Sequence, residues 1–163
     1  MRLSHRNILA DALQNAPAFP PLPGDVYLHA APMFHSADLL GTLWFLFGGA
    51  HVYLPAFTPA GFLETVERYG VTFTMLPPTM VIMALQSPDL TNHDLSSLRG
   101  LIYGASPMTV EWINRTIEAL PGVALIQGYR LTETAPLLTV LSWKAHRDAL
   151  DDFDPVTAGI LRW

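Results

Sequence analysis

The stretch VTFTMLPPT, residues 71–79, decides the fold class of this chain. Its first six residues are β-branched, aromatic or aliphatic, which is typical of a strand that is buried on both faces. Pro77 and Pro78 then end the strand, and proline is favoured in the first turn of a helix. The stretch therefore predicts a buried strand that leads directly into a helix.

The segments on both sides repeat this alternation of strand and helix. Strands that alternate with helices of about ten residues form βαβ units around a parallel sheet. We therefore expect an α/β fold with a mostly parallel sheet and helices on both faces, as part of a larger domain. The predicted strands are residues 26–30, 51–54, 71–76, 101–103 and 123–126, and the predicted helices are residues 5–16, 36–47, 59–69, 78–85 and 106–120.

Two helices have clear boundary signals. Ser4 and Thr58 are favourable N-caps, and Gly70 is a typical residue just after a helix. Apolar spacing then predicts which side of each helix faces the core. The predicted inward residues are Ile8, Leu9, Ala12 and Leu13 in the first helix and Phe62, Leu63, Val66 and Tyr69 in the second.

Composition excludes several functional classes. The chain has 163 residues, of which 50% are hydrophobic and only 14% are charged. So few charges predict apolar faces that pack on further parts of the fold or on another chain. A net charge of −5 with the single lysine Lys144 leaves no basic surface for nucleic acid. Without cysteine, disulfides, thiolate zinc sites and cysteine nucleophiles are excluded.

The longest uncharged run, between Asp38 and Glu64, is not a membrane span. Gly48, Gly49 and Pro55 break it below the roughly 20 apolar residues that a spanning helix needs. The first residues also lack the apolar run of a signal peptide. We expect no transmembrane segment and a cytoplasmic location.

Three unusual segments follow predicted strands, at the edge where open parallel sheets bind ligands. They are APMFH at 31–35, GASP at 104–107 and QGYRLTE at 127–133. The small residues of the second segment would let a ligand approach the backbone, and the next helix would offer amide donors. The alternative is a tight turn that Ser106 caps.

Thr132 and Glu133 place a hydroxyl beside a carboxylate. Magnesium is usually held by one or two carboxylates with substrate phosphates and water, so this pair suits a nucleotide–metal site, although any helix start can carry it. His35 lies in an apolar setting, where a histidine is more often structural than catalytic. No histidine spacing indicates zinc, and residues 104–108 lack the last glycine of a hydrolase nucleophile elbow.

In order and separation, these segments resemble the AMP-forming acyl-CoA synthetases of the adenylate-forming, AMP-binding superfamily. The resemblance implies a fragment of the large N-terminal domain. It also implies a reaction in which a carboxylate attacks the α-phosphate of ATP, pyrophosphate leaves, and the thiol of CoA captures the acyl-adenylate. The matching segments are residues 3–8, 31–35, 77–80, 94–99, 104–108 and 127–133.

The resemblance also implies roles for individual residues and the cofactors ATP or AMP, Mg²⁺ and CoA. Thr132 would contact phosphate and Glu133 would ligate magnesium in the catalytic site, while Tyr129 would lie along the adenine. The other implied nucleotide residues are Gly104, Ala105, Ser106, Gln127 and Gly128, and the implied acid pocket holds Met33, Phe34, His35 and Met80. No charged residue anchors that pocket, which favours a fatty or otherwise apolar carboxylic acid.

Arg130 departs from the family pattern, which has glycine at this position. If that glycine is needed for its backbone angles or for room beside the ligand, arginine costs about 1 kcal/mol or more in strain and narrows the pocket. This hypothesis predicts that Arg130 weakens nucleotide binding and that Arg130→Gly binds ATP more tightly. The alternative is that the side chain points outward.

We expect residues 1–140 to be the central part of the AMP-binding domain without its phosphate loop. Residues 141–163 would be a polar tail that stops before the ribose-binding region and the C-terminal domain with the catalytic lysine. We therefore expect this chain alone to form no acyl-adenylate, which pyrophosphate exchange would test. The alternatives are a non-catalytic acyl-binding or interaction module and an unrelated nucleotide-binding α/β domain.

Overall fold

The computed structural model describes residues 2–151, and the rest of the predicted tail lies outside them. Strands and helices alternate along most of this range. The strands are β1 (Val26–His29), β2 (Ala50–Tyr53), β3 (Phe73–Leu76), β4 (Gly100–Gly104), β5 (Ala124–Arg130) and β6 (Leu137–Leu141). The helices are α1 (His5–Asn15), α2 (Thr42–Leu46), α3 (Pro59–Tyr69), α4 (Pro78–Leu85), α5 (Val110–Ala119) and α6 (Trp143–Asp151), with 3₁₀ turns η1 (Ser36–Gly41), η2 (Leu90–Asn92) and η3 (Thr132–Thr134).

One six-stranded sheet organises the fold, in the order β2-β1-β3-β4-β5-β6. All neighbouring strands are parallel except β6, which runs antiparallel to β5. The predicted α/β fold with a mostly parallel sheet is confirmed. Because the parallel strands run the same way, the segments that follow β1, β3, β4 and β5 meet at one edge, called here the carboxyl edge.

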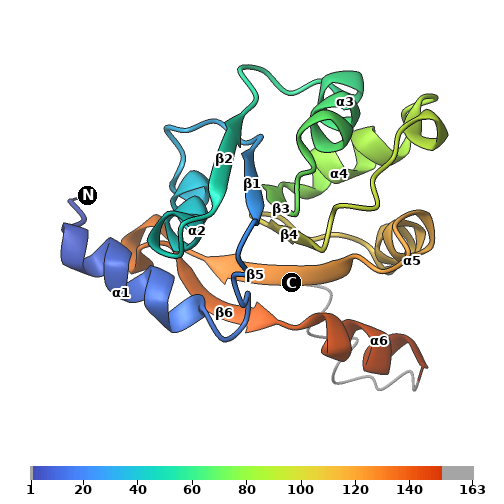
Figure 1. The fold of residues 1–163 in the computed structure, drawn as a ribbon. Helices are drawn as coiled ribbons and strands as arrows, with labels where there is room; N and C mark the ends of the chain where they lie inside the picture. The colour runs from blue at the N-terminus through green and yellow to red at the C-terminus, as the bar shows by residue number, and fades with distance from the viewer. Residues whose placement is uncertain (1, 152–163) are drawn as a thin grey trace.

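Helices cover both faces of the sheet (Figure 1). Successive side chains of a strand point to opposite faces, so β4 contributes to two cores. Leu101 and Tyr103 pack in the core beneath α3, α4 and α5, whereas Ile102 packs in the core beneath α1 and α2. All three side chains are at most 2% exposed.

Helix α1 is capped as predicted but faces the sheet differently. The Ser4 hydroxyl accepts a hydrogen bond from the backbone of the first turn. The predicted inward face is only partly right, because Ala12 is buried but Leu9 and Leu13 are 41% and 55% exposed. Instead, the Asp11 carboxylate accepts a hydrogen bond of 3.1 Å from the backbone N–H of Leu137 in β6. This hydrogen bond turns the Asp11 side of α1, rather than Leu9 and Leu13, toward β6.

Helix α3 matches its prediction closely. Thr58 is the N-cap and accepts a hydrogen bond of 3.1 Å from the N–H of Gly61, and Gly70 ends the helix with a φ of +60°. Tyr69 is the exception, since its side chain is 49% exposed rather than buried. Its ring lies instead under the guanidinium of Arg68, at the outer end of the helix.

Helix α5 begins later than Ser106 and Pro107, where it was predicted to start. Thr109 is its N-cap, and Val110 is its first residue. Between β4 and α5 the chain turns at Ala105, whose φ is +76°, and then buries Met108 to 2% exposure. Ser106 is therefore a loop residue and no cap, and the amide donors of α5 lie three residues further along than expected.

The last predicted strand, residues 123–126, ends too early. Strand β5 continues to Arg130, so residues 127–130 lie on a strand, and the chain then reverses through η3 into β6. Helix α6 occupies the first described part of the predicted tail. It is held by a hydrogen bond of 2.9 Å between the Tyr103 hydroxyl and the His146 Nε2 atom, both buried.

Candidate functional site

The carboxyl edge brings together segments that are far apart in the sequence. The Ser36 Oγ atom lies 3.0 Å from the Thr132 Oγ1 atom, although 96 residues separate them. Ser36 begins η1, just after His35, and Thr132 begins η3. The histidine-containing segment after β1 and the Thr-Glu pair after β5 are therefore neighbours at this edge.

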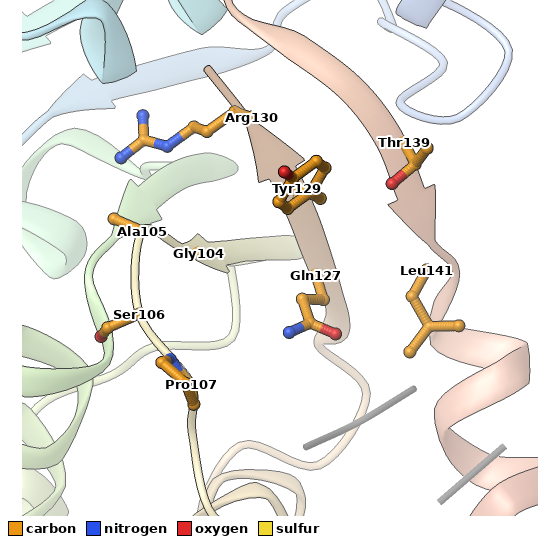
Figure 2. Close-up of a pocket in the computed structure, with 10 residues that line it drawn as sticks. Gly104, Ala105, Ser106, Pro107, Gln127, Tyr129, Arg130, Thr139 and Leu141 are labelled. Atoms are coloured by element: carbon orange, nitrogen blue, oxygen red, sulfur yellow. The ribbon is translucent and has the colours of Figure 1, made fainter. Parts of the chain in front are cut away.

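A cavity of about 420 Å³ lies beside these segments, between β4, β5 and β6. We call it the edge cavity. Six of the seven residues predicted to bind the nucleotide line it, as Figure 2 shows for those that it labels. Its lining is Gly104, Ala105, Ser106, Pro107, Gln127, Gly128, Tyr129, Arg130, Thr139 and Leu141.

Two glycines shape the floor of the edge cavity for reasons of packing. A Cβ atom on Gly104 would collide with the carbonyl oxygen of Gly128, its partner in the β4–β5 ladder. A Cβ atom on Gly128 would lie 2.8 Å from the Leu137 Cδ1 atom. The same closeness leaves backbone, rather than side chain, facing a ligand.

Tyr129 offers a flat surface at the mouth of the edge cavity. Its side chain is 59% exposed, and its neighbour in the adjacent strand is Thr139. An exposed aromatic ring on a rigid strand can stack against a nucleobase at little entropic cost. The lining residues Thr139 and Leu141 were missed, because the sequence reading placed no strand after residue 126.

Arg130 is half-buried and lines the edge cavity. Its side chain extends toward Ala105 and away from Thr139 (Figure 2). Arg130 does not have a positive φ. Among described non-glycine residues, only Ala105 and Ala135 do. The expected backbone strain at Arg130 is therefore wrong, because a strand conformation suits any residue.

Thr132 and Glu133 do not line the edge cavity but form the turn beside it. Glu133 is exposed and borders a separate hollow of about 320 Å³ against α1, which Arg2 and Asp11 also line. Within residues 2–151, no group of three or more histidine, aspartate or glutamate side chains has an arrangement that could hold a metal ion. A single exposed carboxylate still fits magnesium, since this ion commonly takes most of its ligands from phosphates and water.

A second groove, of about 430 Å³, lies at the other end of the carboxyl edge, beyond β1 and β2. We call it the apolar groove. It is lined by three of the four residues predicted for the acid pocket, Met33, Phe34 and Met80, together with Tyr53 and Phe57. His35 is exposed and not among the lining residues, and it instead precedes the first residue of η1.

A hydrogen-bonded pair of histidines beside the apolar groove, His29 buried and His51 partly buried, was not predicted. The His29 Nδ1 atom lies 2.5 Å from an Asp38 carboxylate oxygen, and its Nε2 atom lies 2.7 Å from the His51 Nδ1 atom. When His29 donates from Nδ1, its Nε2 atom accepts from His51. Burial then lowers the pKa of His51 to about 4, helped by His29 and opposed by Asp38. Asp38 therefore orients His29, not the neighbouring His35.

Comparison with known protein families identifies the family of this chain. The family model described as "AMP-binding enzyme" matches residues 2–161. The chain belongs to this family of AMP-binding enzymes. The predicted resemblance to the adenylate-forming CoA ligases is thus confirmed at the level of the family.

Curated relatives of this AMP-binding chain are CoA ligases of aromatic acids by name. It is 37% identical over 144 residues to 4-coumarate–CoA ligase 5 of Oryza sativa subsp. japonica, covering 85% of the chain and 27% of the relative. It is 40% identical over 123 residues to feruloyl-CoA synthase of an Amycolatopsis species, covering 73% of the chain and 24% of the relative. The chain thus spans about a quarter of the length of these relatives.

Among solved structures, the N-terminal domain of FACL13 from Mycobacterium tuberculosis has the same fold. The TM-score is 0.81 at 24% identity, and the match covers 90% of this AMP-binding chain and 37% of the other. Within residues 2–151, no helix combines the length and apolar character needed to cross a membrane.

Proposed function

We propose that this chain forms the nucleotide- and acid-binding part of an AMP-forming CoA ligase. The carboxylate of the acid would attack the α-phosphate of ATP, releasing pyrophosphate, and the CoA thiol would then take the acyl group from the acyl-adenylate, releasing AMP. One observation carries the proposal: residues from 104–107 and 127–130 line one cavity, while the turn that holds Thr132 lies beside it. The expected domain limits at 1–140 and 141–163 stay predictions.

The edge cavity would hold the adenosine part of the nucleotide. The Tyr129 ring would stack on the adenine, and the backbone around Gly104 and Gly128 would let the base approach closely. The Thr132 hydroxyl, already within hydrogen-bonding distance of Ser36, would donate a hydrogen bond to a phosphate oxygen. Such fixed donors stabilise charge that develops during adenylation, because they need no reorganisation during the reaction.

Glu133 would bind magnesium together with phosphate oxygens and water. A bound magnesium ion would neutralise phosphate charge during the attack of the carboxylate. Glu133 lies one residue from Thr132 in the same turn. In this proposal Thr132 contacts the phosphate directly, and Glu133 acts on it through the magnesium ion.

The acid would be apolar, and its proposed site is the apolar groove with Met33, Phe34 and Met80. Phe34 is 86% exposed and Met33 is 65% exposed, so a ligand that covered them would remove apolar surface from water. The names of the relatives favour an aromatic acid such as a hydroxycinnamate over the fatty acid that the sequence predicts. His35, outside this groove, would lie at its border toward the incoming CoA.

The test is AMP binding by the 163-residue chain, measured by isothermal titration calorimetry. Tyr129→Ala should lower the AMP affinity about tenfold, because stacking on a base contributes about 1–3 kcal/mol. Tyr69→Ala is the matched control, since Tyr69 is similarly exposed on the distant helix α3, and it should leave the affinity unchanged.

Two results would reject the proposal. One is a chain that folds but binds no AMP. The other is AMP binding that Tyr129→Ala leaves untouched. Binding of an apolar acid without any AMP binding would instead favour the alternative of a non-catalytic acyl-binding module.

A further inference from the structure

Among residues 2–151, Arg130 is the only charged residue that lines the edge cavity. Its Nη1 atom is closed off from solvent and has no hydrogen-bond partner among residues 2–151. No ion pair of the described residues includes it either. A guanidinium presents five N–H donors, so a half-buried one without acceptors is energetically unfavourable.

Other arginines of the chain show how such a charge is normally compensated. Arg99 binds the buried carboxylate of Asp25 through two contacts of 2.6 and 2.7 Å. Arg115, on the surface of α5, lies 2.8 Å from Glu111 one turn earlier. Arg130 is more enclosed than Arg115 yet has no comparable acid.

The surroundings of Arg130 do not neutralise its charge. Burial lowers the pKa of its guanidinium, and the buried phenol of Tyr27 opposes that shift. Because the ordinary pKa of arginine is above 12, the side chain stays charged at neutral pH. Asp38, whose charge also acts on Tyr27, is already hydrogen-bonded to His29. The charge of Arg130 therefore has no acidic partner among residues 2–151, although the residue lines the edge cavity.

We propose that Arg130 binds an oxyanion in the edge cavity, either the phosphate of AMP or the carboxylate of the acid to be activated. The choice of these two ligands rests on the proposed function. The planar guanidinium can donate two parallel hydrogen bonds to either group. This inference reverses the sign expected from the sequence: Arg130 strengthens the binding of a charged ligand rather than weakening it.

The test compares charged with neutral ligands on the 163-residue chain by calorimetry. One pair is AMP and adenosine, and the other is trans-cinnamate and its neutral amide, trans-cinnamamide. We expect the chain to prefer the charged member of at least one pair about tenfold, as for a charge-assisted hydrogen bond. The pair that shows the preference identifies the source of the oxyanion.

Variants then assign the preference to Arg130. Arg130→Met should abolish it while leaving the affinity for the neutral ligand unchanged, and Arg130→Lys should retain part of it. Arg68→Met is the matched control, since Arg68 lies over the Tyr69 ring on α3, and should keep the full preference. If Arg130→Met does not fold, the Nε–H nuclear magnetic resonance signal of Arg130 in the unmodified chain decides, and it should shift with the charged ligand alone.

The possible failures are distinguishable. If adenosine binds but neither charged ligand is preferred, or if Arg130→Met keeps the preference, this inference is wrong and the proposed nucleotide site stands. If cinnamate is preferred through Arg130 while neither adenosine nor AMP binds, the inference stands and the proposed function fails. If none of the four ligands binds, both fail.

Discussion

The hydroxyls of Ser36 and Thr132 lie 3.0 Å apart and join the segment after β1 to the turn after β5. Because the pair is exposed to water, its net contribution to stability should be small. A double-mutant cycle of urea unfolding with Ser36→Ala and Thr132→Ala should give a coupling of about 0.5–1 kcal/mol. Strictly additive effects would mean that the two segments are not joined in solution.

The carboxyl of Asp11 should make stability depend on pH. Burial raises its pKa to about 6. The folded chain therefore keeps a proton that the unfolded chain loses near pH 4, and this part of the stability is lost as pH rises through 6. Asp11→Asn keeps an acceptor for the Leu137 N–H without the charge, so at pH 7.5 it should be more stable by on the order of 1–2 kcal/mol.

Asp11→Ala is the matched variant, because it removes both the charge and the acceptor. It should be less stable than Asp11→Asn by about 1–3 kcal/mol, the cost of an unsatisfied buried N–H. Urea unfolding at pH 7.5 measures both variants. An Asp11→Asn chain less stable than the unmodified one would contradict this account of α1 and β6.

Acidification should lower the stability of the folded chain through His51, whereas it raises stability through Asp11. The folded pKa of His51, about 4, is below the ordinary value of 6.5. The unfolded chain therefore binds a proton first as pH falls from 6.5 to 4, and stability decreases over this range. In an Asp11→Asn background, His51→Gln should flatten the slope, since glutamine can still donate to His29. Parallel slopes of the two chains in urea unfolding between pH 4 and 6.5 would refute the role of His51.

The local parts of the fold were predictable because their signals lie within a few residues. The strand and helix of residues 71–85 and the capped helix α3 depend on β-branched runs, prolines, an N-cap and a terminal glycine. The grouping of residues 104–106 with 127–129 was predicted from their position near the carboxyl ends of predicted parallel strands and from the family resemblance. These residues line one cavity, as the resemblance to a single nucleotide site implied.

Long-range contacts account for what was missed. The rotation of α1 depends on Asp11 meeting a backbone amide 126 positions away in β6. Strand β6 itself follows a turn that looked like the start of a helix, so the chain reversal was not expected. The pairing of Asp38 with His29 needs β1 and η1 packed together, which no local sequence signal indicates. Arg130 departs from its family pattern, and its direction followed only from the structure.

The most direct test of the central claim, that the edge cavity binds the adenylate, is an AMP titration of the ¹⁵N-labelled chain followed by nuclear magnetic resonance. We predict saturable shifts of the backbone amides at residues 104–106 and 127–130, with residues 59–69 of α3 unaffected. Absence of shifts at saturating AMP, or shifts confined to elements outside the carboxyl edge, would contradict the claim.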